Sequence, residues 1–166
     1  SGRLLGGNDE VVLLDPEGRT LDQVAWNRNW AVGEGVALQL DNRVSSASGN
    51  DDRQAWCLAT EAFGDGDLGT PNAANATCAS WDTEDPVPEG TGELRSPVVN
   101  DVLITELLIN PDAVPDARGE WVELTNTTLD EIDLSGCQLT DSSDNDASRG
   151  VFALPDGTTL APQGTL

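Results

Sequence analysis

The chain has 166 residues, enough for one domain with an apolar core and too few for two large ones. It carries 30 acidic against 8 basic residues, all of them arginine, and its formal net charge of −22 repels the phosphates of nucleic acids and anionic membranes. This charge favours cations or basic proteins as partners, or simply keeps an extracellular protein in solution, and no apolar run reaches the roughly 18–20 residues of a membrane span.

The first predicted element is a β-hairpin over Asp9–Trp26. Its two arms, VVLL and TLDQVAW, flank the tetrapeptide Asp15-Pro16-Glu17-Gly18. Asp, Pro and Gly stand at the first, second and fourth positions, as a type I turn prefers, and the Asp side chain can accept a hydrogen bond from the backbone two residues on. No stretch of the chain shows a helical repeat.

The next segments alternate between short strands and loops. Val36–Leu40 is a predicted strand, and the polar stretch Asp41–Arg53 is a predicted solvated loop. Ala55–Leu58 follows, and then the Gly-rich phrase Phe63–Asn75. Residues 79–98 are acidic and contain three prolines, which predicts an extended linker.

The region from Val102 to Leu139 contains the most apolar run of the chain. Val102–Ile109 is apolar on both faces, which predicts a strand buried within a sandwich. Two further strands are predicted at Glu120–Asn126 and Ile132–Leu139. An acidic loop at 141–150 and a strand, turn and second strand in the tail complete the chain.

The phrases of this region are similar to a known family. "ITEL…NP…GEWVEL-N-T…IDLSGC-L" resembles the opening of a lamin tail domain, and "W…GTPNAAN" resembles its closing phrase, with Asn72 where glycine is usual. The resemblance implies an all-β fold, an immunoglobulin-like β-sandwich. It also implies a module of secreted or surface bacterial proteins.

The two phrases occur in reversed order. Residues 1–78 resemble the C-terminal half of a module and residues 99–166 the N-terminal half of the next, joined by the linker 79–98. We call residues 1–78 the front segment and 99–166 the rear segment. The arrangement, with no initial Met, predicts a window from a tandem repeat of modules. The complementary segments are expected to pair within the chain in permuted order, or else between chains.

The three cysteines predict one disulfide in a secreted protein. We expect Cys57 to pair with Cys78, because this bond closes a loop with little core of its own and contributes about 3 kcal/mol. Cys137 is expected to be a buried thiol, with a disulfide as the alternative. Three scattered cysteines and no histidine disfavour zinc.

Asp65 and Asp67, in the loop GDGD, form the better of several candidate calcium sites. Carboxylate oxygens on a flexible loop are the ligands that calcium prefers, and the neighbouring glycines let backbone carbonyls converge. The spacing does not match an EF-hand, so solvated turns are the alternative. No other cofactor is predicted.

Catalytic patterns are weak. Glu106, Glu120 and Glu123 could serve as an acid/base pair, but they fall in predicted strands, and no histidine is present to build a triad. Trp26, Trp30 and Trp81 lie in or near loops. Partial burial against the sandwich is the favoured expectation for them, and exposed indoles that stack on sugars are the alternative. Trp56 and Trp121 are expected in the core.

The sequence therefore predicts a noncatalytic lamin-tail-like module, extracellular or at a cell surface, that serves adhesion, spacing or partner binding. Its partner is expected to be a protein or a polysaccharide, without nucleic acid. The alternative is an accessory module of a secreted hydrolase or nuclease that binds polysaccharide or calcium.

Overall fold

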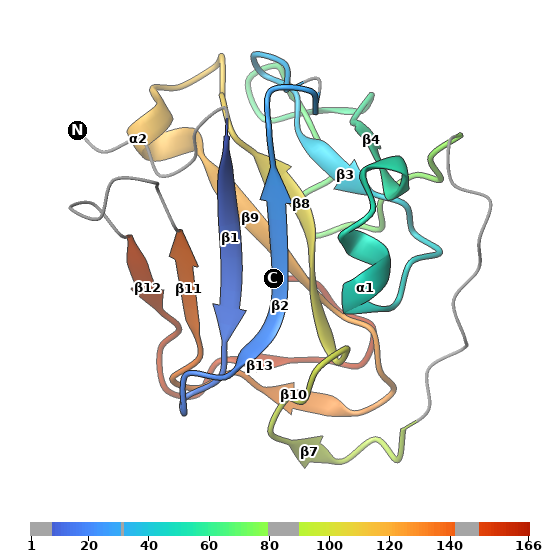
Figure 1. The fold of residues 1–166 in the computed structure, drawn as a ribbon, viewed down its shortest axis with the longest axis vertical. Helices are drawn as coiled ribbons and strands as arrows, with labels where there is room; N and C mark the ends of the chain where they lie inside the picture. Colours follow the sequence, from blue (N-terminus) through green and yellow to red (C-terminus); the bar gives the residue numbers. More distant parts are fainter. Residues whose placement is uncertain (1–7, 31, 80–89, 142–149) are drawn as a thin grey trace.

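The computed structural model describes residues 8–30, 32–79, 90–141 and 150–166. Two four-stranded sheets dominate it (Figure 1). The first has the order β12 (Val151–Ala153), β11 (Gln138–Asp141), β1 (Asp9–Leu14) and β2 (Thr20–Trp26). The second has the order β4 (Trp56–Leu58), β3 (Leu38–Leu40), β8 (Val102–Leu108) and β9 (Trp121–Asn126). The structure thus confirms the predicted all-β sandwich.

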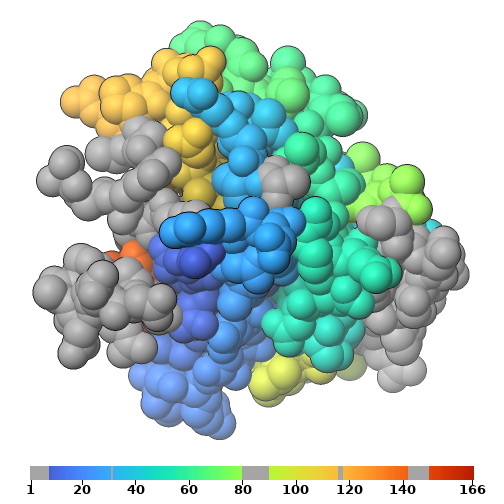
Figure 2. Space-filling model, turned by 45° about the horizontal axis from the view of Figure 1, so that its top comes forward, coloured from blue at the N-terminus to red at the C-terminus, as the bar shows by residue number. Residues whose placement is uncertain are grey.

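Smaller elements close the ends of the sandwich. A three-stranded sheet has the order β13 (Thr159–Leu160), β10 (Glu131–Asp133) and β7 (Leu94–Arg95), and β5 (Ala62–Phe63) pairs with β6 (Asp67–Leu68). The helical elements are single turns: α1 (Ala47–Asn50), α2 (Asp116–Gly119) and the 3-10 turn η1 (Arg53–Ala55). Figure 2 shows α1, in teal, beside the blue β1–β2 hairpin.

The predicted hairpin is confirmed, and its turn has the expected chemistry. The Asp15 carboxylate accepts hydrogen bonds from the backbone N–H groups of Glu17, at 3.0 Å, and Arg19, at 2.8 Å. Gly18 adopts φ +79°, a left-handed conformation that side chains with a Cβ rarely adopt. This turn fixes the register in which Val11 faces Val24 across the two strands.

The front and rear segments share both large sheets and one core. In the first sheet β1 pairs antiparallel with β11, and in the second β3 pairs antiparallel with β8. Leu13, Leu38, Ile104 and Ile132 belong to the same cluster of buried side chains. The chain therefore closes on itself, and each segment buries the apolar faces that the other exposes.

Strand β8 is at the centre of this core. It pairs with β3 on one side and β9 on the other, and it also contacts β2 of the facing sheet. Every residue from Val102 to Leu108 is buried, as its apolar sequence predicts.

The predicted strand Ile132–Leu139 is wrong, because the chain turns in the middle of it. Gly136 has φ +74°, and the Cys137 N–H donates to the Leu134 carbonyl at 3.0 Å. The Asp133 carboxylate also accepts from the Ser135 N–H at 2.9 Å. As a result β10 and β11 belong to different sheets.

The prediction of a solvated loop at Asp41–Arg53 is confirmed only in part. This stretch contains α1 and the first residue of η1, and its Asp41 and Asn50 are 1% and 0% exposed. The Asn50 amide donates to the Asp22 carboxylate at 2.7 Å, and the Asn50 carbonyl accepts from the Trp56 indole N–H at 2.7 Å. Asp41 and Asn50 therefore bond buried groups of the fold. Other residues of the stretch face water, among them Asn42, Asp51 and Asp52.

Part of the segment predicted as a linker joins the fold. Its residues 94 and 95 form β7, which pairs parallel with β10. The Arg95 guanidinium donates to Asp130 at 2.7 Å and to Asp101 at 2.9 Å. The bond from Arg95 lowers the pKa of Asp130 to about 2. Residues 80–89 of the predicted linker lie outside the described residues.

Candidate functional site

Two glutamates lie buried side by side in the second sheet. Glu106 of β8 faces Glu123 of β9 in the strand register, and their exposed fractions are 0% and 3%. Facing residues of antiparallel strands present their side chains on the same side of the sheet. Two acidic groups are thus held together inside the protein, which is costly unless they find hydrogen-bond partners.

The partners come from the loop 69–75, whose sequence is GTPNAAN. The Thr70 N–H donates to both carboxylate oxygens of Glu106, at 2.9 and 3.1 Å. The Asn72 N–H donates to Glu123 at 2.8 Å, and the Asn75 amide donates to the Thr105 carbonyl at 2.8 Å. The two glutamates therefore fasten this loop, which belongs to the front segment, to strands of the rear segment.

The loop also explains two special residues. A Cβ on Gly69 would lie 3.0 Å from the Phe63 ring and 3.1 Å from the Glu106 carboxylate, so a larger residue would require these two side chains to shift by a few tenths of an ångström. Asn72, where the family phrase usually has glycine, adopts φ +61°. Asparagine tolerates this left-handed conformation better than most residues, which accounts for the departure.

Burial and the hydrogen bonds from Thr70 act in opposite directions on the pKa of Glu106: burial raises it, and the hydrogen bonds lower it. The Thr70 hydroxyl has one proton and two acceptors in reach, the Asn75 side-chain oxygen at 2.8 Å and Glu106 Oε2 at 3.1 Å. If Oε2 carries a proton, it donates to Thr70, and the Thr70 hydroxyl donates to Asn75. Burial, together with the nearby charge of Glu123, raises the pKa of Glu106 to about 7.

This proton makes stability depend on pH. The pKa of Glu106 is 4.5 in a model peptide and about 7 in the fold. The protonated carboxyl therefore stabilises the fold fully below pH 4.5, and this stabilisation is lost as pH rises through 7. Glu106→Gln supplies an amide donor in place of the proton. We expect this variant to unfold with a flatter pH dependence than the parent and to be the more stable of the two at pH 8. Urea unfolding between pH 4.5 and 8 measures how the free energy of unfolding changes with pH. The slopes of the two proteins should differ by up to about 1.4 kcal/mol per pH unit.

The matched control for this experiment is Glu61→Gln, because Glu61 is exposed. Its pH profile should follow that of the parent. A Glu106→Gln profile parallel to the parent's would show that Glu106 stays ionised in the fold.

A polar hollow of about 450 Å³ lies beside the loop. Hydroxyl, amide and carboxylate side chains contribute to its lining, among them Asn72, Asn75, Glu123, Thr125 and Gln163. Both oxygens of Glu123 already accept hydrogen bonds, from Asn72 and from the Thr105 hydroxyl at 3.0 Å. Glu106 and Glu123, which the sequence offered as candidates for an acid/base pair, thus hold the loop 69–75 on the sandwich.

Comparison with known families bears on this half of the molecule. Residues 95–166 match the Lamin Tail Domain family. The family consists of immunoglobulin-like domains. The match includes both glutamates and begins at Arg95, inside the segment predicted as a linker. No curated protein and no solved structure matches the chain.

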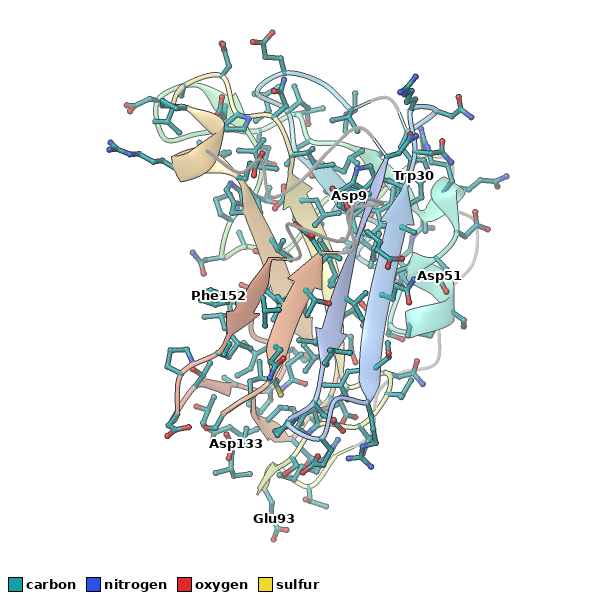
Figure 3. The ribbon with its side chains drawn as sticks, turned by 60° about the vertical axis from the view of Figure 1, so that its left-hand side comes forward. Asp9, Trp30, Asp51, Glu93, Asp133 and Phe152 are labelled. Atoms are coloured by element: carbon teal, nitrogen blue, oxygen red, sulfur yellow. A yellow bond between two sulfur atoms is a disulfide. The ribbon has the colours of Figure 1, made fainter. Side chains whose placement is uncertain are left out.

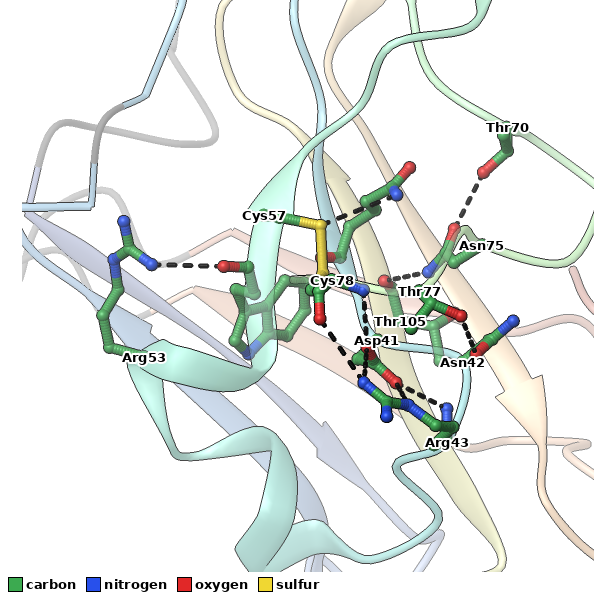
Figure 4. Close-up of a disulfide and its surroundings, with 12 residues drawn as sticks. Asp41, Asn42, Arg43, Arg53, Cys57, Thr70, Asn75, Thr77, Cys78 and Thr105 are labelled. Atoms are coloured by element: carbon green, nitrogen blue, oxygen red, sulfur yellow. Dashed lines mark hydrogen bonds and ion pairs between the residues drawn. A yellow bond between two sulfur atoms is a disulfide. The ribbon is translucent and has the colours of Figure 1, made fainter. Parts of the chain in front are cut away.

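The disulfide lies outside the Lamin Tail Domain match. Cys57 and Cys78 are bonded, as predicted, and their sequence separation is 21 residues (Figure 4). The Asp41 carboxylate accepts from the Cys78 N–H at 2.5 Å and from the Arg43 guanidinium at 2.8 Å. The disulfide and this ion pair attach the end of the front segment to β3 and β4.

Cys137 lies within the Lamin Tail Domain match and is a buried free thiol, the first of the two expected outcomes. Its exposed fraction is 0%. Burial and the nearby carboxylates raise the pKa of Cys137 to about 11, so the thiol stays protonated and unreactive at neutral pH.

The two predicted calcium ligands have different environments. Asp65 is exposed in the turn between β5 and β6, whereas Asp67 is 5% exposed. Asp67 Oδ1 accepts from the backbone N–H groups of Asp112, at 3.0 Å, and Ala113, at 3.1 Å, which ties the GDGD loop to the Lamin Tail Domain match. Among the described residues, no group of three or more His, Cys, Asp or Glu could hold a metal ion. Calcium binding at this loop stays a prediction.

The tryptophans are mostly in the core. Trp26, Trp30 and Trp56 are 3%, 5% and 1% exposed, which confirms the favoured expectation that Trp26 and Trp30 pack against the sandwich. Trp121 is half-buried, and its ring meets Phe63 edge-on with 5.9 Å between centroids. Trp81 lies outside the described residues. Neither Trp26 nor Trp30 can therefore stack on a sugar.

None of the helices in the described part of the chain is long and apolar enough to cross a membrane.

Proposed function

We propose that the protein is a noncatalytic immunoglobulin-like module of a large secreted or surface bacterial protein, which serves adhesion, spacing or partner binding. The observation that supports this most is the role of Glu106 and Glu123, whose oxygens accept hydrogen bonds from the loop 69–75. The disulfide favours an oxidising compartment, and a net charge of −22 suits a surface exposed to salt.

A hydrolase assay tests the noncatalytic part of the proposal. The purified protein is incubated with polysaccharide, peptide, ester and nucleic-acid substrates, and Glu123→Gln serves as the paired variant. We expect no turnover from either protein. Turnover by the parent that Glu123→Gln abolishes would overturn the proposal and identify Glu123 as a catalytic residue.

Antibody labelling of the source cells tests the location. Antibodies raised against this chain should label intact cells as strongly as permeabilised ones. Labelling that requires permeabilisation would contradict a surface location, and recovery from the culture medium would indicate secretion.

We further propose that the front and rear segments are complementary parts of lamin-tail-like modules in a tandem repeat. The shared sheets and common core support this, because each segment alone would expose an apolar face. A protease site introduced between residues 84 and 85 makes the idea testable, since no disulfide spans that position.

After cleavage at this site, the two pieces should elute together as one particle of the original 17.5 kDa mass. They should separate in denaturant, which controls for complete cleavage. Separation in native buffer would show that the segments do not form one unit.

A further inference from the structure

Two buried oxygens where α1 meets β2 and β8 have no hydrogen-bond partner among the described residues. They are Asp22 Oδ1 and Asn50 Oδ1. The two residues are only 2% and 0% exposed. A buried acceptor without a donor is costly, so a stable fold that contains two of them side by side requires an explanation.

The other polar atom of each of these two side chains is bonded. The Asn50 amide nitrogen donates to Asp22 Oδ2 at 2.7 Å, and the Ile104 N–H donates to the same oxygen at 2.7 Å. The Asn50 nitrogen also lies 3.4 Å from the Ile104 carbonyl oxygen. The amide therefore turns its nitrogen toward two acceptors, and exchanging its nitrogen and oxygen would lose both contacts without satisfying the unpaired oxygens.

A single proton can satisfy both oxygens. The carboxyl and the amide are planar groups, and when such a pair closes into a ring, the two atoms that are not yet joined face each other. Both of these atoms are acceptors here, and a protonated carboxyl provides the one O–H donor that joins them. A proton needs no space of its own, whereas a buried water requires a cavity.

We propose that Asp22 is protonated in the fold and donates its proton to Asn50, so that a cyclic acid–amide pair fastens α1 to β2 and β8. β3 pairs with β8 only at Glu106 and Leu107, and the pairing of β8 with β9 is irregular just after Ile104. The acid–amide pair thus binds the Ile104 backbone in place of a neighbouring strand. Loss of the proton leaves two unpaired acceptors, one of them charged, and loosens α1.

The surroundings of Asp22 disfavour its ionised form. Leu13 of β1 faces Asp22 in the strand register, and β8 presents the backbone of Ile104, another apolar residue. Asp51 lies at the end of α1, beside β2 (Figure 3), and its negative charge acts on Asp22. Burial, with a smaller contribution from Asp51, raises the pKa of Asp22 to about 6, although the bonds from Ile104 and Asn50 act in the opposite direction.

The attachment of α1 should therefore weaken as pH rises. The pKa of Asp22 is 3.8 in a model peptide and about 6 in the fold. The proton stabilises the closed pair fully below pH 3.8, and this stabilisation is lost as pH rises through 6. Above pH 6, each further pH unit should increase the fraction of molecules with an open pair about tenfold.

NMR spectroscopy of the intact protein measures the proton and its effect. The carboxyl carbon of Asp22 should titrate near pH 6 in the parent. Asp22→Asn supplies an amide N–H in place of the proton, so its pair should stay closed at every pH. The protection of the Ile104 N–H against hydrogen exchange in the parent, relative to Asp22→Asn, should fall about tenfold per pH unit above pH 6. Both proteins keep Glu106, so its own titration cancels in this ratio.

Asp51→Asn is the matched control, because it removes one charge from an exposed position on α1 without altering the pair. It should lose protection at Ile104 with rising pH, as the parent does. An Asp22 carboxyl that titrates near 3.8, or a protection ratio that does not change with pH, would overturn the proposal and indicate a buried water between the two oxygens. The titration of the parent decides between these results even if Asp22→Asn does not fold.

Discussion

Replacing Trp56 by alanine should lower the free energy of unfolding by about 3–5 kcal/mol, among the largest effects expected of a point substitution in this protein. The side chain is 1% exposed, and its ring lies 5.9 Å from that of Trp30. Its indole N–H also donates to the Asn50 carbonyl at 2.7 Å. The substitution thus leaves both a cavity and an unpaired buried carbonyl. Urea unfolding followed by circular dichroism measures the loss.

Trp56→Phe separates the two causes. Phenylalanine fills most of the space but cannot donate a hydrogen bond, so it should lose about 1–3 kcal/mol, the cost of an unpaired buried acceptor with a small cavity. A Trp56→Ala variant as stable as the parent would mean that η1 and β4 are not packed on the core. Equal losses for both variants would assign the whole effect to the hydrogen bond.

Local sequence signals predicted the elements that depend on local physics. The β1–β2 hairpin follows from the turn preferences of Asp15, Pro16 and Gly18, and β8 follows from an apolar run that only a doubly covered strand can bury. In both cases neighbouring residues carry the whole signal. The lamin-tail resemblance of the rear segment, which residues 95–166 match, rests on such local phrases too.

Other features depend on contacts between distant residues. Ile132–Leu139 reads as one apolar strand, and only the division of β10 and β11 between two sheets reveals the turn at Gly136. The single helical turns α1 and η1 are too brief to show a period. Asn50 is buried because Asp22 and Trp56 reach it from other elements. No local pattern contains that information.

The roles of Glu106 and Glu123 were missed for the same reason. Their strands were predicted, but their partners Thr70 and Asn72 lie 36 and 51 residues away in the sequence. A glutamate at the centre of an apolar run was the available signal. A buried carboxylate requires hydrogen-bond donors, and in the fold the backbone N–H groups of the loop GTPNAAN supply them.

The acidity of the chain has a structural component beside its effect on solubility. Asp15, Asp41, Asp67, Asp101 and Asp130 are each no more than 6% exposed. Each accepts hydrogen bonds from backbone N–H groups of turns or loops. A fold made of short strands has many loop N–H groups to satisfy, and aspartate does so with a short acceptor side chain. Part of the negative charge therefore fixes loops.

Removing the disulfide by Cys57→Ala together with Cys78→Ala should lower the free energy of unfolding by about 3 kcal/mol, the value expected for a closed loop of this length. The bond spans 21 residues that include β5, β6 and the loop 69–75. Its loss gives the unfolded chain more conformational freedom in this loop, which binds Glu106 in the fold. Dithiothreitol should lower the stability of the parent by the same amount and leave the double variant unchanged.

Cys137→Ala is the control for this experiment, because Cys137 is a buried free thiol. It should cost only about 1 kcal/mol for the lost sulfur and should respond to dithiothreitol as the parent does. If dithiothreitol leaves the parent unchanged, the disulfide contributes nothing to stability, and the contacts of Asp41 with Cys78 and Arg43 hold the segment alone. If the double variant loses far more than the loop closure predicts, the bond also supports native packing around Trp56, which precedes Cys57 in β4.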